Sequence, residues 1–595
     1  MGFAGLTATA VAQSAPTCVP ASLDNSALQA GAITISPLPG SRDAAPQTQI
    51  SFLGAPASEL SVQSVTGTRS GSHPGRLEAY SQGDGASFLP SRPFLPGERV
   101  TVKATVTLGG VPRAILDVFV VASPDEISST PETIHSGTSA QEQHFHSRSD
   151  LRPPIVTVTA NSPEAAPGDI FVAPYTGPGQ AGPMILDPSG GLLWFEPLPR
   201  DTFATDLRVQ EYLGQPVLTW WQGDISVHGF GTGEGVIANS AYRDIARIRA
   251  GNGHMVDLHE LQLTPQGTAL VTAYFPILCD LSSVGGPSYG GLTDGVMQEI
   301  DVKTGLVMYE WSSLDHVALS ESYTQVQGSS TAYPFDFFHF NSINLDRDGS
   351  LMISARNTWT VYDLNAQTGT INWRLGGKKS SFAQPTDTRT AWQHDPRELP
   401  DGAISLFDNG ASPTVHRQSR GIVVQLNRGT GSATLVTQLF HAPPLLVESQ
   451  GNLQALPDGN WFLGWGQEPF FSELNPQGKT LFDAHFPLHT QSYRSFRFPW
   501  VGIPEHAPVF SFISAGRGAG TVYASWNGAT QVAAWRVLAG ASPQSLHAIL
   551  TAPRDGFETA IALPGGTAGP YLEAQALEAG GKVLRSTAAA SEPGL

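Results

Sequence analysis

The sequence predicts an all-β protein built around a six-bladed β-propeller, with a β-sandwich domain on either side of it. Two series of strand–turn–strand units repeat between residues 151 and 505, and no part of the chain shows a convincing helical period. The repeats recur every ~50–80 residues, a spacing typical of four-stranded propeller blades. Five or six blades fit the available length, and we favour six.

The two series interleave along the chain. The first turns at Gly267, Gly349, Gly402 and Gly459, in ELQLTPQGTALVTAY, SINLDRDGSLMISAR, PRELPDGAISLFDNG and NLQALPDGNWFLGWG. The second comprises ILDPSGGLLWF, EIDVKTGLVMYEW, DLNAQTGTINWRL, QLNRGTGSATLV and ELNPQGKTLFDA. One hairpin from each series supplies the four strands of a blade.

The flanking regions read as separate all-β units. Residues 31–123 contain short alternating strands separated by turn clusters, the pattern of an immunoglobulin-like β-sandwich. Residues 124–150 are polar and aperiodic, which indicates a linker. Residues 509–590 alternate again and resemble a fibronectin type III module. Scaffolding or contact roles are expected for both terminal units.

Composition and charge restrict the partners and the compartment. The net charge of −18 argues against nucleic acid or an anionic membrane surface. No run approaches the ~20 apolar residues of a transmembrane helix. Residues 1–12 resemble the end of a signal peptide, with Ala10 and Ala12 as an A-x-A site, so a secreted or periplasmic protein is expected. Cys18 and Cys279 are the only cysteines, and the sequence does not show whether they pair.

Three histidines occupy corresponding places in the first series. His259 and His394 each lie eight residues before their turn glycine, and His339 lies ten residues before its own. Because the innermost strands of a propeller line its channel, matched positions at their starts converge on the axis. The fourth hairpin carries residues 450–452 (QGN) there instead, which indicates a site with a defined face. The other histidines show no such register and are expected in surface or structural roles.

Arg356 adds a permanent positive charge. It ends the strand SLMISAR, whose partner strand follows His339, so the hairpin is expected to return Arg356 to the same end of the channel. Three imidazoles alone suit zinc or copper, but a guanidinium repels a dication and binds an oxyanion through paired hydrogen bonds. A salt bridge to Asp346 or Asp348 is the alternative. We therefore expect an anion site with no metal and no cofactor.

These residues lie in segments that match a known family. DLHELQLTPQGTALV, FHFNSINLDRDGSLMISAR and WQHDPRELPDG resemble the motifs of bacterial arylsulfotransferases that work without a nucleotide sulfate donor. The run FHSRSDLRPP resembles that family's segment before the propeller. The resemblance implies a six-bladed propeller and a sulfohistidine intermediate on His394, with His259, His339 and Arg356 holding the sulfuryl oxygens.

The resemblance implies an enzyme that transfers a sulfuryl group from an aryl sulfate to a phenol by a ping-pong route. An imidazole nucleophile divides such a transfer into two displacements, and cationic or N–H donors hold the sulfuryl oxygens. A second histidine moves the phenolic proton; we favour His259, although the sequence does not separate it from His339. Asn357 departs from the family pattern, in which another histidine follows the arginine.

Two other functions stay open at this point. A metal-dependent hydrolase or oxidoreductase would use the three histidines as ligands, and a non-catalytic extracellular propeller would bind a polymer or surface. Five aromatic residues are candidates for an aryl pocket, with core packing as the alternative. They are Phe337, Phe338, Phe340, Trp392 and Trp465.

Overall fold

The computed structural model describes residues 20–24, 33–126, 130–326, 333–567 and 569–591. Over these ranges the protein is all-β, as the sequence predicted, with ten sheets and no α-helix. The helical turns are of the 3-10 type: Ala57–Glu59, Ser139–Gln141, Ser282–Val284, Leu319–Glu321 and Thr386–Thr388. No described helix is long and apolar enough to cross a membrane. Residues 1–12 and Cys18 lie outside the described ranges.

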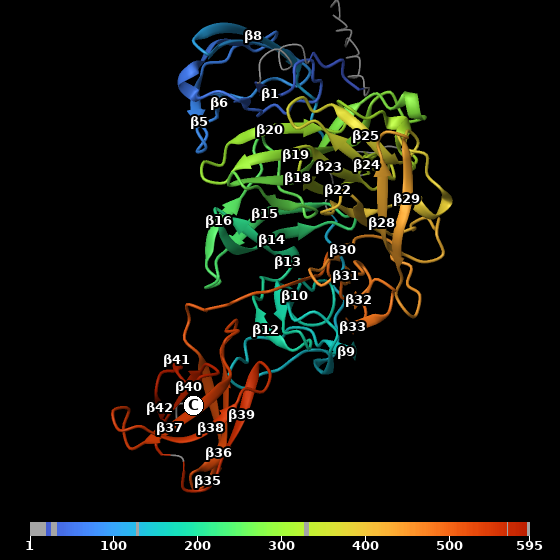
Figure 1. The fold of residues 1–595 in the computed structure, drawn as a ribbon. Helices are drawn as coiled ribbons and strands as arrows, with labels where there is room; N and C mark the ends of the chain where they lie inside the picture. The colour runs from blue at the N-terminus through green and yellow to red at the C-terminus, as the bar shows by residue number, and fades with distance from the viewer. Residues whose placement is uncertain (1–19, 25–32, 127–129, 327–332, 568, 592–595) are drawn as a thin grey trace, which may run out of the picture.

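Six sheets, called here the central sheets, contain the two series of hairpins and follow one another around a common centre (Figure 1). In hydrogen-bonded order, the first sheet contains β34 (Phe496–Phe498), β10 (Asp169–Val172), β11 (Met184–Leu186) and β12 (Leu192–Phe195), and the second contains β13 (Phe203–Tyr212), β14 (Gln215–Ile225), β15 (Gly231–Ala238) and β16 (Asp244–Ile248). The third sheet contains β17 (Leu261–Leu263), β18 (Thr268–Cys279), β19 (Gly290–Asp301) and β20 (Val307–Ser312), and the fourth contains β22 (Phe340–Leu345), β23 (Leu351–Ala355), β24 (Thr360–Leu364) and β25 (Ile371–Gly376). The fifth sheet contains β26 (His394–Glu398), β27 (Ile404–Asp408), β28 (Arg420–Asn427) and β29 (Ser432–Leu439), and the sixth contains β30 (Asn452–Ala455), β31 (Trp461–Gly464), β32 (Phe470–Leu474) and β33 (Thr480–His485). In addition, β21 (Phe335–Asp336) pairs with β19.

The turn glycines explain where the hairpins of the first series reverse. Gly267, Gly349, Gly402 and Gly459 have φ values of 79°, 84°, 81° and 90°. Glycine adopts this left-handed conformation without the steric cost of a side chain. The strands on either side then pair in register, as in Leu261 with Val271.

Strands from the two ends of the central region close the ring of sheets. β9 (Thr157–Asn161) pairs antiparallel with β33, the last strand of the sixth sheet. β34 returns to pair with β10 in the first sheet. Each pairing joins segments more than three hundred residues apart, so local sequence patterns did not reveal it. The closing strand β34 also brings residues 493 and 494 to the centre.

Packing between neighbouring central sheets forms several apolar cores. In one of them, Met352 and Trp373 from one sheet meet Leu406 and Ile422 from the next. Such face-to-face packing of sheets holds the inner strands at fixed positions. The side chains at the starts of the inner strands are therefore carried on a rigid scaffold.

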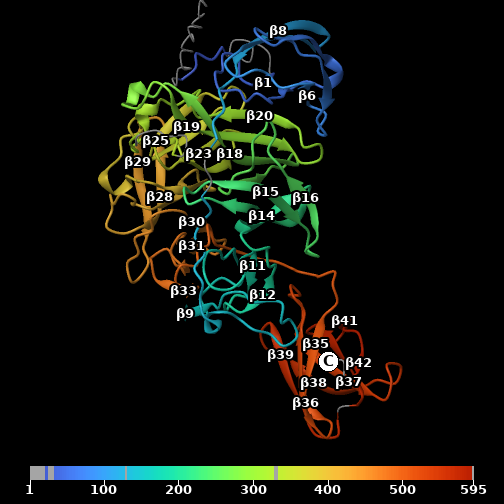
Figure 2. The same ribbon diagram turned by 180° about the vertical axis from the view of Figure 1, so that it is seen from behind.

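The terminal sheets lie at opposite ends of the molecule (Figures 1 and 2). The N-terminal pair comprises β1 (Thr34–Ser36), β2 (Ile50–Leu53), β6 (Gly85–Pro90) and β5 (Gly75–Ala79), and β4 (Gly71–Ser72), β3 (Leu60–Gly67), β7 (Arg99–Leu108) and β8 (Val111–Val120). The C-terminal pair comprises β35 (Val509–Gly516), β36 (Ala519–Ser525) and β39 (Glu558–Leu563), and β38 (His547–Pro553), β37 (Ala534–Gly540), β40 (Tyr571–Leu577) and β41 (Val583–Ser586), with β42 (Ala590–Ser591) beside β40.

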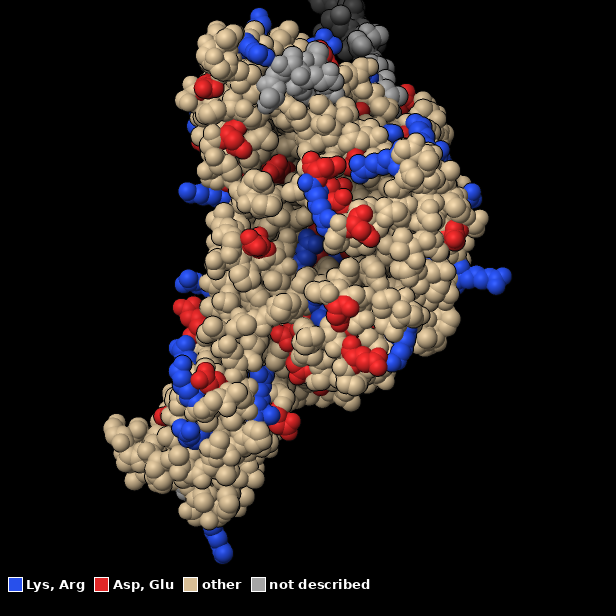
Figure 3. Space-filling model, in the orientation of Figure 1, with Lys and Arg blue, Asp and Glu red and all other residues tan. Residues whose placement is uncertain are grey.

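The N-terminal sheets are joined to the central sheets by polar contacts with β20. The hydroxyl of Ser51 donates to the carbonyl of Val307 at 2.6 Å, and the hydroxyl of Ser36 donates to the carbonyl of Glu310 at 3.3 Å. Cys279, at the end of β18, is disulfide-bonded. Charged side chains are sparse and of mixed sign on the face that Figure 3 shows.

Candidate functional site

A cavity of about 580 Å³ opens at the centre of the ring of sheets. His259, His339, Arg356 and His394 all line it, so the structure brings the four predicted site residues together. A cavity of this size is typical of sites for small organic ligands. The cavity is therefore the candidate functional site.

The three histidines stand at the starts of inner strands of consecutive sheets. His259 lies two residues before β17, His339 directly before β22, and His394 is the first residue of β26. His339 has a φ of 54°, a strained value for a residue with a side chain, and Gln450, two residues before β30, has a φ of 69°. Such backbone strain concentrates at functional sites held in place by their surroundings.

Arg356 reaches the cavity through the hairpin that the sequence predicted. Its backbone N–H donates to the carbonyl of His339 at 2.9 Å. The guanidinium donates to Asn357 Oδ1 at 3.2 Å and to the carbonyl of Glu448 at 3.0 Å, and it stacks on the Trp392 ring at 4.8 Å. Burial lowers the pKa of Arg356 to about 10, so it stays cationic at neutral pH.

The guanidinium retains capacity for an anion. Its Nε is buried without a hydrogen-bond partner among the described residues. Asp346 and Asp348, the alternative partners, bind elsewhere: Asp346 accepts from Asn344, and Asp348 accepts from the Ser350 hydroxyl at 2.6 Å. An incoming oxyanion can supply the missing acceptor.

His259 and His339 are each paired with a carboxylate. Nδ1 of His259 contacts Asp257 Oδ2, and Nδ1 of His339 lies 2.5 Å from Asp336 Oδ2. The two rings are nearly perpendicular, with centroids 5.1 Å apart. Burial lowers the pKa of His259, while the negative charge of Asp257 opposes that shift. A carboxylate partner stabilises the imidazolium, which suits a group that gives and takes a proton.

His394 has a different partner. Its Nδ1 lies 2.7 Å from Oδ1 of Asn409, so Nδ1–H donates and Nε2 carries the lone pair. Nε2 in turn accepts the backbone N–H of Gln450 at 3.2 Å. Burial and then the charge of Arg356 lower the pKa of His394 well below its ordinary value. His394 is thus a neutral imidazole with an oriented lone pair, the form required of a nucleophile.

Two tyrosines pack against the histidines: Tyr493, which lines the cavity, and Tyr274, which is not among the lining residues. The Tyr493 ring stands edge-on to His259 at 5.4 Å and to His394 at 6.4 Å between ring centroids. Tyr274 packs against His259 at 5.8 Å and His339 at 5.9 Å. Tyr493 and His259 are buried, so their side chains have restricted freedom of movement.

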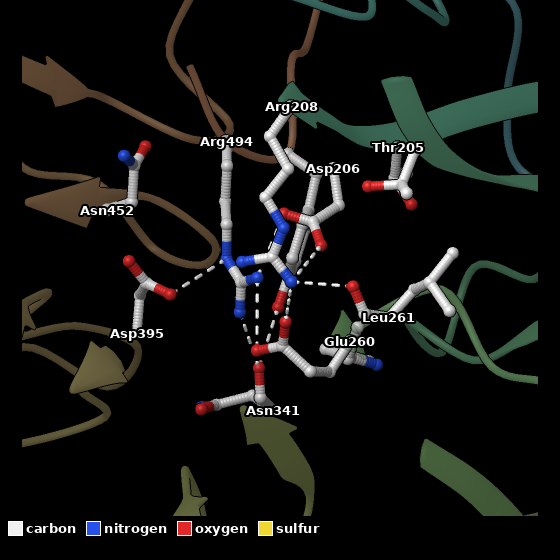
Figure 4. A network of polar contacts seen from close by, with 12 residues as sticks. Thr205, Asp206, Arg208, Glu260, Leu261, Asn341, Asp395, Asn452 and Arg494 are labelled. Atoms are coloured by element: carbon white, nitrogen blue, oxygen red, sulfur yellow. Dashed lines mark hydrogen bonds and ion pairs between the residues drawn. The ribbon is translucent and has the colours of Figure 1, made fainter. Parts of the chain in front are cut away.

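A buried ionic network is formed by charged residues, several of which are next in sequence to residues that line the cavity (Figure 4). Arg494 is fully buried and pairs with Asp206 at 2.9 Å, Glu260 at 3.2 Å and Asp395 at 3.2 Å. Arg208 pairs with Asp206 and Glu260, and Arg397 pairs with Glu260 and Asp395. Three guanidinium groups thus face three carboxylates, and the charges balance.

The network and the cavity share the same three chain segments. Glu260 follows His259, Asp395 follows His394, and Arg494 follows Tyr493. Burial raises the pKa of Glu260, but Arg397, Arg494 and Arg208 together hold it below its ordinary value. These ion pairs tie the backbones of the three segments to one another at the centre, and so position the side chains that face the cavity.

Sequence reasoning missed the partners of the histidines. Asp257 and Asp336 precede their histidines by two and three residues, so D-x-H and D-x-x-H spacing was available as a signal. Asn409 directly follows β27, the strand that pairs with β26 beside His394, and no comparable local pattern marked it. Asn357, the departure from the family pattern, donates to the backbone carbonyl of Asp336 at 2.8 Å and to its carboxylate at 3.0 Å.

The five candidate aromatics do not line the cavity, and the alternative role of core packing holds for them. Phe337, Phe338, Phe340 and Trp465 are fully buried in apolar cores, and Trp392 is 2% exposed beneath Arg356. Packing against neighbouring sheets accounts for them. The aromatic side chains that do line the cavity are Tyr175, Tyr333, Phe335 and Tyr493.

The described side chains do not form a metal site. No group of three or more His, Cys, Asp and Glu residues within the described ranges is placed to hold a metal ion. The Nδ1 atoms of the three site histidines are engaged by Asp257, Asp336 and Asn409. The positive charge of Arg356 also lines the same cavity.

Comparison with solved structures gave only weak likenesses. A protein of unknown function from Bacteroides caccae has a TM-score of 0.36 and 14% identity, covering 56% of this chain and 99% of its own. A catalytically inactive virginiamycin B lyase from Staphylococcus aureus has a TM-score of 0.29 and 9% identity, covering 63% and 97%. An auxiliary nutrient binding protein from Bacteroides ovatus has a TM-score of 0.26 and 10% identity, covering 83% and 94%. At these TM-scores the likenesses carry no argument.

One protein-family model matches this chain. Curated proteins gave no match. The model described as "Arylsulfotransferase (ASST)" matches residues 208–487, a range that contains all four predicted site residues. This match supports an assignment of residues 208–487, the larger part of the central sheets, to the arylsulfotransferase family.

Proposed function

We propose that this protein transfers a sulfuryl group from an aryl sulfate to a phenol in two steps, through a sulfohistidine on His394. The observation that carries the assignment is the pairing of His394 with the neutral amide of Asn409, while His259 and His339 are paired with carboxylates. Of the three imidazoles, His394 is the one whose Nδ1 has a neutral amide as its partner and whose Nε2 lone pair is oriented by a backbone N–H. The family match supports the reaction class.

In the first step, Nε2 of His394 attacks the sulfur atom and the bond between sulfur and the aryl oxygen breaks. The hydrogen bond from the backbone N–H of Gln450 to Nε2 must break before Nε2 can approach the sulfur atom. The departing aryl oxygen takes a proton from the imidazolium of His259, whose charge Asp257 stabilises. Arg356 and His339 donate to the sulfuryl oxygens as charge redistributes.

In the second step, neutral His259 takes the proton of the acceptor phenol, whose oxygen attacks sulfur as the bond between sulfur and nitrogen breaks. Nδ1 keeps its proton throughout, because Asn409 accepts it without removing it. The sulfated ring is therefore a cationic imidazolium and a good leaving group. A carboxylate in place of Asn409 would instead stabilise the protonated imidazolium of the free enzyme, which has no lone pair on Nε2 to attack sulfur.

The finer architecture and the location are part of the same proposal. We infer that the six central sheets are the blades of a propeller, flanked by an immunoglobulin-like and a fibronectin type III-like sandwich. We also infer a secreted or periplasmic location, supported by the disulfide at Cys279, because such bonds persist in oxidising compartments. Expression of the full-length protein in a bacterial host tests whether it is exported. The protein is then compared in the forms with the Cys279 disulfide intact and reduced.

The test of the mechanism is mass spectrometry of protein quenched in alkali after mixing with 4-nitrophenyl sulfate without an acceptor. A sulfuryl adduct on the peptide carrying His394, absent in His394→Ala and discharged by phenol, is the expected result. An adduct on another residue, or transfer retained in His394→Ala, would overturn the assignment. His416→Ala, at a histidine outside the cavity lining, is the matched control.

A further inference from the structure

The linker after the N-terminal sheets (residues 124–150) is hydrogen-bonded to the central sheets beside the cavity. Its backbone hydrogen bonds join Asp125 N–H to Pro276 (2.8 Å), Val227 N–H to Thr130 (3.0 Å), Glu132 N–H to Ile225 (2.8 Å) and His135 N–H to Thr176 (2.6 Å). The His135 ring also stacks on His489 at 4.4 Å. The light-blue segment in Figure 2 runs from the N-terminal sheets toward β9. These contacts hold the described residues of the linker on either side of 127–129 against the central sheets.

The linker places the carboxylate of Glu132 in the lining of the proposed catalytic cavity. Glu132 lines the cavity and is half-buried, and its side chain accepts the neighbouring N–H of Thr133 at 2.8 Å. Glu448, from the loop before β30, lines the same cavity. Neither carboxylate forms an ion pair with a Lys, Arg or His side chain in the described part of the chain, whereas Asp336 is bound by His339 and Asn357.

The cavity lining has more carboxylates than guanidinium or ammonium groups, a balance of charge that does not favour an aryl sulfate with no positive charge of its own. Arg356 is the one guanidinium or ammonium group among the described residues that line it, and Glu132, Asp336 and Glu448 line the same cavity. A sulfate ester brings a further negative charge, and like charges in a partly buried cavity repel each other. A positive charge elsewhere on the substrate would relieve this repulsion.

We propose that Glu132, together with Glu448, selects aromatic substrates that carry a protonated amine in addition to the phenolic oxygen. The inference rests on the proposed sulfuryl transfer and narrows its substrate class to phenolic amines and their sulfate esters. The carboxylates attract the ammonium group, and the aromatic rings of Tyr175 and Tyr333 in the same cavity offer faces on which a cation or an aryl ring can pack.

The test compares three acceptors that differ in charge but little in size: 4-(2-aminoethyl)phenol, 4-ethylphenol and 3-(4-hydroxyphenyl)propanoate. With 4-nitrophenyl sulfate as donor near neutral pH, kcat/KM is expected to fall by about five- to tenfold at each step in that order. In Glu132→Gln the ratio of ammonium to neutral acceptor falls toward one, and Glu132→Gln with Glu448→Gln removes the discrimination. Glu126→Gln, an exposed carboxylate of the same linker outside the cavity lining, leaves the ratio unchanged.

The wild-type protein supplies a second measurement that needs no variant. Added sodium chloride is expected to reduce the preference for the ammonium acceptor, because salt screens the attraction. Sulfuryl transfer to all three acceptors at similar kcat/KM, or a preference unaffected by both carboxylate substitutions, would overturn this inference alone. Absence of transfer to any acceptor would overturn the proposed function and the inference with it.

Discussion

Nδ1 of His394 lies 2.7 Å from Oδ1 of Asn409, an amide partner where His259 and His339 have aspartates. The same amide donates from Nδ2 to the carbonyl of Gln450 at 2.9 Å, and the N–H of Gln450 reaches Nε2 of His394. Asn409 therefore holds both the imidazole and the loop that meets its reactive nitrogen. It acts as a positioning residue for the nucleophile.

Replacing Asn409 with Asp is expected to change the pH dependence of the first step. A carboxylate beside Nδ1 stabilises the imidazolium and raises the pKa of His394 by about 1–3 units. The burst of 4-nitrophenol at saturating donor would then lose amplitude at a higher pH than in the wild type, because protonated His394 cannot attack. Rapid-mixing absorbance across a pH series measures this. Asn427→Asp, at an exposed turn, is the control, and superimposable profiles for N409D and wild type would contradict the role of Asn409.

The depressed pKa of His394 makes a prediction for the wild type itself. A histidine whose folded pKa lies below 6.5 keeps its neutral form as pH falls through that value. The first-step rate should therefore not fall between pH 7 and pH 6, where an ordinary histidine would lose about two thirds of its neutral fraction. Single-turnover measurements with 4-nitrophenyl sulfate test this. A loss of rate that follows a pKa near 6.5 would show that His394 is not held neutral.

Arg356→Lys should lower kcat/KM by about a hundredfold, with most of the loss in kcat. Lysine keeps the charge but loses the planar donors, of which Nε is unpartnered, and the guanidinium face that stacks on Trp392. Steady-state kinetics with an aryl sulfate donor and a phenol acceptor measure the effect. The exposed Arg347→Lys serves as control. Equal kinetics for R356K and wild type would remove Arg356 from the reaction.

Arg494→Met should destabilise the protein by about 3–5 kcal/mol, because three buried carboxylates then lose a shared cation. The loss should appear as a lower midpoint of urea unfolding, accompanied by lower activity as the segments carrying His259 and His394 loosen. The exposed Arg200→Met is the matched control. An unchanged midpoint would show that the network does not hold the centre together.

Asp117 offers a test of stability away from the site. It faces the core of the N-terminal sheets between Ile115 and Phe119, with neither carboxylate oxygen partnered among the described side chains. Burial raises its pKa to about 8, so the folded state favours the protonated form, and its contribution to stability is lost as pH rises from 3.8 through 8. Asp117→Asn should therefore raise the unfolding temperature at about pH 9 more than at about pH 5.

Calorimetry of D117N and wild type at these two pH values measures the difference. The exposed Asp84→Asn controls for the loss of one negative charge from the same sheets. A gain in unfolding temperature that is equal at both pH values would assign the effect to packing rather than to ionisation.

Several parts of the site could be predicted because they depend on short stretches of chain. The spacing of His259, His339 and His394 from their turn glycines indicated that the three residues occupy corresponding positions on three hairpins. In the structure all three line one cavity. The return of Arg356 beside His339 followed from pairing within a single hairpin. Hydrophobic alternation and turn residues likewise indicated the all-β class.

The sequence by itself therefore determined the hairpins, the positions of the histidines on them and the resemblance that suggested the chemistry. Only the tertiary structure decided the partner of His394, the place of Tyr493 in the segment before the closing strand β34, and the presence of Glu132 in the cavity lining. It also placed Phe337 in a core rather than in the cavity. The physical reason is that these features depend on which faces of distant strands pack together, and residue spacing along the chain carries no information about that.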